Sequence, residues 1–208
     1  NEKQEKILNA AEDIFLEKGK DGASMQMIAD HAGVNKAMLF YYFTNKDLLY
    51  KEVLKANFYQ MLTQLGNIIV SEGKPDKKIE AFVDAYIAFF RDHPDLPKLM
   101  LREIAAGGET VKQMIHELKD VIPFRMPNTI IEFVGSGIKE GQFRDVDPKQ
   151  TIISIAGMSL IYFLGKPLIQ AALDLEDVEE QKFIEQRKES IVDLLKYGIL
   201  IRSENDSH

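Results

Sequence analysis

The side chains that most often perform catalysis or bind metals are scarce in this 208-residue chain. Cysteine is absent, which removes thiol nucleophiles, disulfides and thiolate zinc sites, and fits a reducing cytoplasm. The histidines at His31, His93, His116 and His208 are scattered, and none forms a metal-binding pair at helical spacing. We therefore predict no metal, no cofactor and no catalytic residues.

One glycine-rich stretch, VGSGIKEG at 134–141, could suggest nucleotide chemistry. A dinucleotide-binding loop follows a strand, whereas the preceding NTIIEFV has a helical pattern. Gly141 suits the end of that helix, and Ser136 lacks the surroundings of a nucleophile elbow. We interpret this stretch as structural, and a helical enzyme is kept only as an alternative.

Residues 31–43, HAGVNKAMLFYYF, carry side chains suited to non-covalent binding of a partner. This stretch crowds apolar and aromatic side chains around a single fixed charge, Lys36. Such crowding is unsuited to a free surface. We infer that part of the cluster packs inside the protein and that the rest contacts a partner.

The elements that must position this stretch have the layout of a helix-turn-helix. Ser24 can cap a helix over residues 25–31, and Asn35 can cap a second short helix. Ala29 is small enough for the place where the helices cross, and Gly33 tolerates the positive φ of the turn. The predicted inward side chains are Ile28, Ala32, Val34, Leu39 and Phe43, and the predicted outward ones are Lys36, Ala37, Met38, Tyr41 and Tyr42.

Apolar periodicity predicts helices along the whole chain, so the expected fold class is all-α. A stripe from Ile7 to Phe15 predicts a first helix that ends at Gly19. The later helices are expected near residues 45–70, 76–92, 96–106, 110–141 with a kink at Pro123 and Pro127, 148–165 and 177–202. SEGKPDK at 71–77 is the clearest break in the pattern.

Composition limits the partners. The formal charge of −7 gives no general attraction to nucleic acid or anionic membranes, so any such contact must come from a local patch. The longest nearly apolar run, 152–165, is shorter than the ~18 residues that a membrane span needs. We expect no membrane contact, and we expect this run to be a helix buried on most sides.

The stretch SMQMIADHAGVNKAMLFYYFTNKDLL, residues 24–49, resembles the DNA-binding segment of the TetR family of bacterial transcriptional regulators. The likeness covers about residues 4–56. It implies an N-terminal helix-turn-helix DNA-binding domain over residues 1–50. It also implies a larger helical ligand-binding and dimerisation domain over residues 51–208, with helix 45–70 linking the two.

The resemblance also implies which residues meet double-stranded DNA. Asn35, Lys36, Ala37 and Met38 match the major-groove face of the recognition helix. The positions that match phosphate or neighbouring base-edge contacts are Met25, Gln26, Tyr41, Tyr42 and Lys46, with Ser24 and Phe40 beside them. Where the family commonly has tyrosine this chain has Phe40, so one hydroxyl-to-phosphate bond cannot form. The first fifty residues hold six lysines against eight acidic side chains, so we expect few phosphate contacts and a modest salt dependence.

The larger domain has more aromatic and methionine side chains than simple packing of a small bundle needs. We predict that some of them line a pocket for a small apolar effector, although each could instead be ordinary core. Glu103 is either a polar anchor in this pocket or part of an exposed ion pair with Arg102. The predicted ligand-binding residues are Phe58, Met61, Tyr86, Phe89, Phe90, Met100, Glu103, Met114, Phe133, Met158 and Tyr162.

The last two long helices offer more apolar surface than one bundle can hide, which predicts a homodimer. The predicted interface residues are Ile152, Ile155, Ile184, Ile191, Leu194 and Leu195. The expected function is a cytoplasmic repressor that leaves an inverted-repeat operator when the effector binds. The alternatives are a helical small-molecule-binding protein that binds no DNA, and a transcriptional activator.

Overall fold

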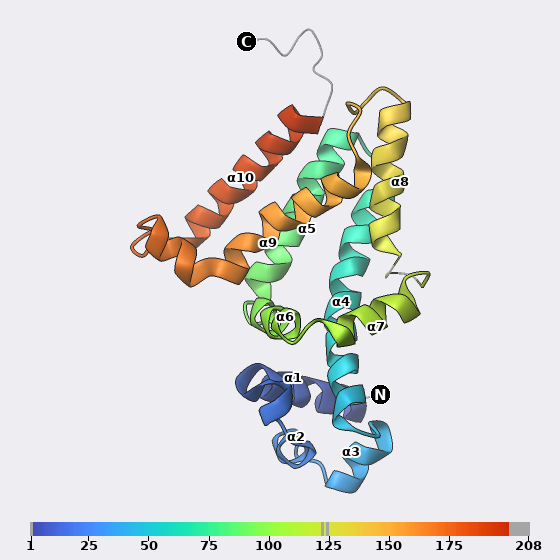
Figure 1. Cartoon of the computed structure of the whole chain (residues 1–208), viewed down its shortest axis with the longest axis vertical. Helices are drawn as coiled ribbons and strands as arrows, with labels where there is room; N and C mark the ends of the chain where they lie inside the picture. Colours follow the sequence, from blue (N-terminus) through green and yellow to red (C-terminus); the bar gives the residue numbers. More distant parts are fainter. Residues whose placement is uncertain (1, 122, 124, 200–208) are drawn as a thin grey trace. The chain divides into compact units, whose positions relative to one another are not determined.

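The computed structural model describes residues 2–121, 123 and 125–199, and these residues form ten α-helices and no strand (Figure 1). The all-α prediction is confirmed. The helices are α1 Glu2–Gly22, α2 Met25–Ala32, α3 Lys36–Tyr42, α4 Lys46–Val70, α5 Pro75–Asp92, α6 Leu96–Ala105, α7 Glu109–Leu118, α8 Met126–Lys139, α9 Pro148–Ala172 and α10 Glu180–Ile199.

The described residues fall into two compact units. Unit 1 contains residues up to 60 together with 94–120, and unit 2 contains 61–93 together with the residues from 121 onward. The sequence-based division at residue 50 differs from this grouping, because α6 and α7 pack with the N-terminal helices rather than with the later ones. The long helix α4 contributes its first part to unit 1 and its last ten residues to unit 2.

In unit 1, α1 buries an apolar stripe that includes Ile7, Ala11 and Phe15. Gly19 interrupts this helix at φ 74°, a backbone conformation that glycine adopts without a Cβ clash. The sequence placed the end of the first helix at this residue. One further turn, up to Gly22, follows the kink before the chain enters α2.

A polar cluster joins α6 and α7 to the rest of unit 1. One guanidinium nitrogen of Arg102 donates to the carbonyl oxygens of Phe15 and Leu16, at 2.8 and 2.7 Å. The neighbouring Glu103 is buried, and its carboxylate accepts the backbone N–H groups of Thr110 and Val111 at the start of α7. Arg102 therefore holds α6 on α1, and Glu103 caps α7.

Tyr50 of α4 completes this cluster. Its side chain is almost fully buried and hydrogen-bonds to the Glu103 side chain. Burial raises the pKa of the Tyr50 hydroxyl well above its ordinary value, and the negative charge of Glu103 raises it further. The hydroxyl therefore keeps its proton over the whole ordinary pH range and donates to the carboxylate.

Unit 2 is built from α5, α8, α9 and α10 with the end of α4, and α9 contacts each of α5, α8 and α10. Its core is rich in aromatic rings: Tyr86 lies edge-on to Phe90 at 5.3 Å, and Phe90 lies 5.8 Å from Phe163 of α9. Burial raises the pKa of Tyr86 to about 12. These rings form ordinary core contacts between helices.

Two predicted helices need correction. The single helix expected over 110–141 is two helices, α7 and α8, because the chain leaves the helical path before Pro127 enters the first turn of α8. The helix expected over 148–165 continues through Pro167 to Ala172. It is not buried on most sides: only a small part of its apolar surface is covered. By length and composition alone α9 could also cross a membrane.

A close approach ties the end of α8 to the following loop. The Phe143 ring lies so near the backbone of Gly137 that a Cβ there would come within 2.2 Å of a ring carbon. The backbone N–H groups of Gln142 and Phe143 both donate to the Gly137 carbonyl oxygen. The N–H of Arg144 then donates to the carbonyl of Ile199 at the end of α10. Because Gly137 has no side chain, the Phe143 ring can pack directly against its backbone. We call this contact the Gly137 seat.

Replacing Gly137 with alanine is expected to lower the free energy of unfolding by about 2 kcal/mol, as in other overpacked cores. Gly135→Ala is the matched control in the same helix, because its Cβ would meet no neighbouring atom. That change should instead stabilise α8 by roughly 0.5–1 kcal/mol through helix propensity. Urea unfolding followed by circular dichroism measures the free energy of unfolding of both variants. Equal effects of the two changes would show that the close contact between Phe143 and Gly137 does not matter for stability.

Candidate nucleic-acid interface

The helix-turn-helix forms as the sequence predicts. The Ser24 side chain accepts the Met27 N–H at 3.2 Å and begins α2. Gly33 ends α2 in the left-handed region at φ 62°. The Asn35 side chain accepts the Met38 N–H at 2.7 Å and begins α3. These caps fix the turn between the helices and the direction of α3.

The first turn of α3 presents the residues expected at base edges. Lys36 and Ala37 are exposed and Met38 is half-buried. Behind them Leu39 is fully buried, together with Phe43 at the end of the helix. The small Ala37 leaves room for close approach, and the Lys36 amine can donate to base acceptors.

Aromatic residues continue this surface along α3. Tyr41 is 83% exposed and packs edge-on against Tyr42 at 5.2 Å. Phe40 is 42% exposed, and the Lys36 ammonium lies 5.9 Å from its ring centroid. Because Phe40 is exposed in the single chain, its side chain contributes little to the stability of the fold. An exposed ring of this kind is typical of a surface that contacts a partner.

Lys46 at the start of α4 has a structural role that the sequence did not suggest. Its ammonium donates to the backbone carbonyl oxygens of Ala23, at 2.9 Å, and Asp21, at 3.4 Å. An ammonium has three protons, so one donor is left for a phosphate oxygen. Lys46 therefore ties α4 to the segment before α2 and can contact an anion at the same time.

The other predicted contacts lie at the start of α2. Met25 is half-buried and Gln26 is exposed, with its side-chain amide donating to Asp30 at 2.8 Å. Ser24 is exposed although its oxygen is used as the cap. The N-terminal ends of α2 and α3 thus both carry exposed polar groups, as a phosphate-contacting surface requires.

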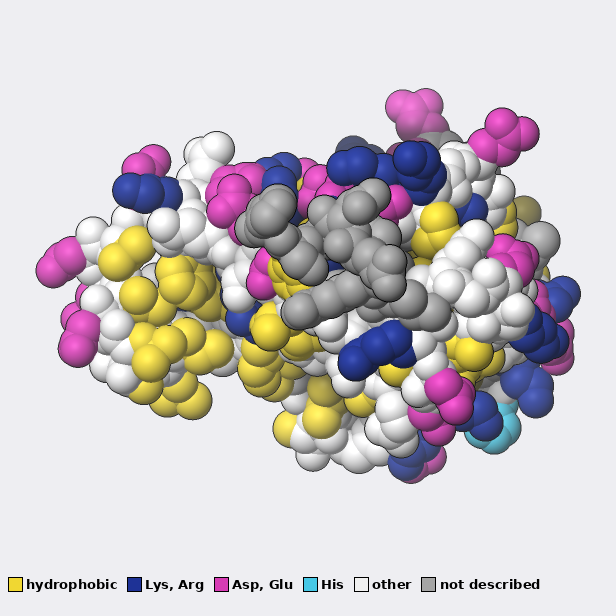
Figure 2. Space-filling view, turned by 90° about the horizontal axis from the view of Figure 1, so that it is seen from above, with side chains coloured by type: hydrophobic (Ala, Val, Ile, Leu, Met, Phe, Trp, Pro, Cys, Tyr) yellow, Lys and Arg dark blue, Asp and Glu magenta, His cyan; other side chains and the backbone are white. Residues whose placement is uncertain are grey.

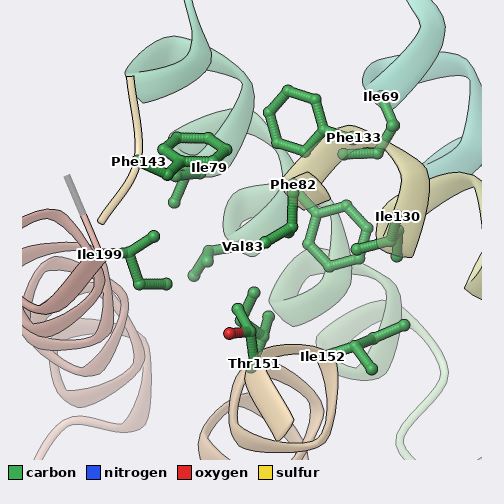
Figure 3. Close-up of a pocket in the computed structure, with 12 residues that line it drawn as sticks. Ile69, Ile79, Phe82, Val83, Ile130, Phe133, Phe143, Thr151, Ile152 and Ile199 are labelled. Carbon is green, nitrogen blue, oxygen red and sulfur yellow. The ribbon is translucent and has the colours of Figure 1, made fainter. Parts of the chain in front are cut away.

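Unit 2 holds an apolar cavity of about 20 Å³ (Figure 3). Its walls come from α4, α5, α8, the α8–α9 loop, α9 and α10. The lining residues are Ile69, Ile79, Phe82, Val83, Ile130, Phe133, Val134, Phe143, Thr151, Ile152, Ile155 and Ile199. Thr151 supplies the only side-chain oxygen of this lining, and its hydroxyl donates to the Asp147 carbonyl at 2.9 Å.

Most of the predicted ligand-binding residues lie elsewhere. Phe133 lines the cavity, whereas Glu103 is the helix-capping carboxylate of unit 1. Unit 1 also contains Phe58, Met100 and Met114. The remaining predicted residues, Met61, Tyr86, Phe89, Phe90, Met158 and Tyr162, belong to unit 2 and do not line this cavity. Sequence reasoning missed Phe143, whose contact with Gly137 only the folded chain reveals.

The predicted dimer-interface residues also need to be reassigned. Ile155, Ile184, Ile191 and Leu195 are buried within unit 2, and Ile152 lines the cavity. Leu194 alone of the predicted set is strongly exposed. The structure exposes a different apolar set on α9, its C-cap residue and α10. Figure 2 shows hydrophobic side chains gathered at its left, the side on which Figure 1 places the end of α9. This set, called the α9–α10 face below, consists of Ile153, Ile161, Leu168, Leu173, Leu194 and Tyr197.

The geometry of α2 and α3 defines a helix-turn-helix protein that binds DNA. Residues 7–53 match the bacterial regulatory proteins of the tetR family, and residues 75–195 match the tetracyclin repressor-like C-terminal domain. The chain belongs to the TetR family of bacterial regulatory proteins, as the sequence motif predicted. It is a DNA-binding transcriptional regulator and not an enzyme.

Some related proteins match nearly the whole chain and others match part of it. The Escherichia coli K12 regulator RutR is 26% identical over 198 residues, which cover 95% of this chain and 90% of RutR. The transcriptional activator FasR of Mycolicibacterium smegmatis is 29% identical over 89 residues, 43% of this chain and 41% of FasR. A candidate fatty acid metabolism regulator of Clostridium perfringens has the same fold, with a TM-score of 0.72 at 18% identity. That match covers 95% of this chain and all of the other.

Proposed function

We propose that this regulator is a homodimeric repressor that binds an inverted-repeat operator and leaves it when a small apolar effector binds unit 2. The observation that carries the proposal is the exposed start of α3, where Lys36 and Ala37 stand outside a capped and well-packed helix-turn-helix. A two-fold dimer presents two such helices about one turn of DNA, ~34 Å, apart or a multiple of it.

The α9–α10 face supports the homodimer. Ile161 and Leu168 lie seven residues apart on one side of α9, and both are exposed. The opposite side of the helix packs into unit 2 through Ile155 and Tyr162. An exposed apolar stripe on a helix that is already folded needs a partner surface, and a second copy offers the same stripe by two-fold symmetry.

Two lysine substitutions test DNA binding by gel shift with the DNA upstream of the protein's own gene. Lys36→Ala is expected to weaken operator binding about tenfold and to relax base preference, because it removes a base-edge donor. Lys46→Ala should weaken binding to all sequences alike and reduce the salt slope by about 1. Lys139→Ala, an exposed lysine of α8, is the control. Unchanged affinity and footprints in both variants would count against this surface.

We expect α4 to transmit the effect of effector binding to the DNA-binding helices. This helix is continuous from Lys46 to Val70, and Ile69 in its last turn lines the cavity. An effector that prefers one arrangement of α4 shifts operator affinity only by its difference in affinity for the two arrangements. We expect a roughly 5- to 150-fold loss of operator affinity. Linkage requires operator DNA to weaken effector binding by the same factor, so equal effector affinities with and without operator would exclude this coupling.

Activation is the second candidate, since FasR is named as an activator. Both roles use the same DNA-binding surface. A reporter gene controlled by the upstream DNA separates them: deletion of the regulator raises expression under repression and lowers it under activation.

A further inference from the structure

The cavity of unit 2 offers almost nothing for a polar ligand to bind. Thr151 is its single polar lining residue, and the proton of that hydroxyl is already donated to the Asp147 carbonyl. The backbone N–H groups of Phe143 and Arg144 beside the lining are also used, by the carbonyl oxygens of Gly137 and Ile199. A carboxylate or carbonyl placed here would lose its water without gaining a donor, which is strongly unfavourable.

One cation adjoins the cavity without lining it. The Lys78 ammonium donates to the carbonyl of Ile69 at 2.9 Å and lies 5.5 Å from the ring centroid of Phe133. It therefore lies beside two lining residues and is held there by the carbonyl and the ring. The ammonium has three protons and donates only one of them to this carbonyl, so an acidic ligand could still reach Lys78, and Lys78 is the group through which the inference can fail.

The free volume is small, and two of its lining residues, Phe133 and Ile152, are only half-buried. About 20 Å³ is slightly more than the ~10–15 Å³ that a single water needs, and an apolar cavity of this kind stays dry. The Phe133 ring lies edge-on to Phe143 at 5.4 Å, and a ligand larger than the free volume has to displace this half-buried ring. Phe143 is almost fully buried and is seated against Gly137, so it stays in place.

We propose that the cavity binds an uncharged hydrocarbon-type molecule with no required hydrogen bond, and that Phe143 in its seat on Gly137 sets the size of that molecule. The inference rests on the proposed ligand-responsive function, because it names the chemical class of the effector. Selectivity then comes from exclusion: charged and hydrogen-bonding molecules are rejected by the cost of losing water.

The lining contains six isoleucines, which provide the readout. The full-length protein, labelled with ¹³C at isoleucine methyl groups, is titrated by NMR with benzene and separately with benzoate, without DNA. Benzene is expected to shift the methyl signals of the lining isoleucines, such as Ile130 and Ile155, and to leave those of Ile7 and Ile28 in unit 1 unchanged. Benzoate should bind at least tenfold more weakly. Absence of any benzene-dependent shift, or equal or tighter binding of benzoate, would overturn the proposal.

Two variants make the result specific. Phe143→Ala, or Phe143→Leu if the alanine variant does not fold, should strengthen benzene binding several-fold and admit naphthalene. Unchanged affinities would refute the role of Phe143. Lys78→Met should leave the preference for benzene unchanged, whereas a preference that appears only in this variant would show that Lys78 anchors acids.

The same benzene titration can be repeated with operator DNA as a separate measurement. Benzene that binds the cavity but leaves operator affinity unchanged would refute ligand-gated repression while supporting the hydrocarbon site. Operator release by a ligand that does not shift the lining isoleucines would do the reverse. The two proposals therefore fail in different experiments.

Discussion

Replacing Leu168 with aspartate is expected to give a folded monomer in place of the proposed dimer. Leu168 is 78% exposed in the single chain, so the change leaves the core of unit 2 intact. A buried leucine contributes about 1.5–3 kcal/mol, and two-fold symmetry places two copies in the interface. The dimer should therefore lose about 3–6 kcal/mol, and light scattering at micromolar concentration should report the monomer mass.

The control for this change is Val70→Asp, which places the same charge at an exposed apolar residue outside the α9–α10 face. It should remain dimeric. Ile191→Asp would be a poor test, because Ile191 is fully buried and its loss would unfold unit 2. A dimer mass that persists in Leu168→Asp and in Ile161→Asp would exclude the α9–α10 face as the interface. A monomer should also lose most of its operator affinity, since each half-site is then bound alone.

Replacing Glu103 with alanine is expected to cost about 3 kcal/mol of unfolding free energy. The change leaves the N–H groups of Thr110 and Val111 without their acceptor and removes the partner of the buried Tyr50 hydroxyl. Each buried group left unsatisfied costs roughly 1–3 kcal/mol. Part of this cost is offset because the alanine variant no longer pays the desolvation penalty of a buried carboxylate.

Hydrogen exchange makes the Glu103 test specific. The amides of Thr110 and Val111 should exchange faster in Glu103→Ala, and Glu103→Gln should retain much of their protection because its amide oxygen can still accept. Glu109→Ala is the control on the same helix, since that exposed carboxylate pairs only with Lys112 among the contacts described. It should change stability little. Unaltered exchange at both amides in the alanine variant would contradict the capping role of Glu103.

The helix-turn-helix could be predicted from sequence because its determinants are local. Ser24 and Asn35 each cap a helix through a residue three positions later, and Gly33 meets the backbone requirement of one turn. The inward and outward sides of α3 follow from the helical period, so Leu39 and Tyr41 are placed correctly without knowledge of the rest of the fold.

The cavity, the α9–α10 face and the polar cluster of unit 1 could be decided only by the tertiary structure. An apolar side chain such as Ile191 or Ile161 has the same sequence signal whether its neighbour is the core or a second protomer, so periodicity could not separate them. Glu103 carries a charge that indicates an exposed or ligand-binding site, yet it lies buried because the distant Tyr50 and the start of α7 converge on it. Local chemistry determined where the helices begin and end, while contacts between residues far apart in the chain determined what each helix face touches.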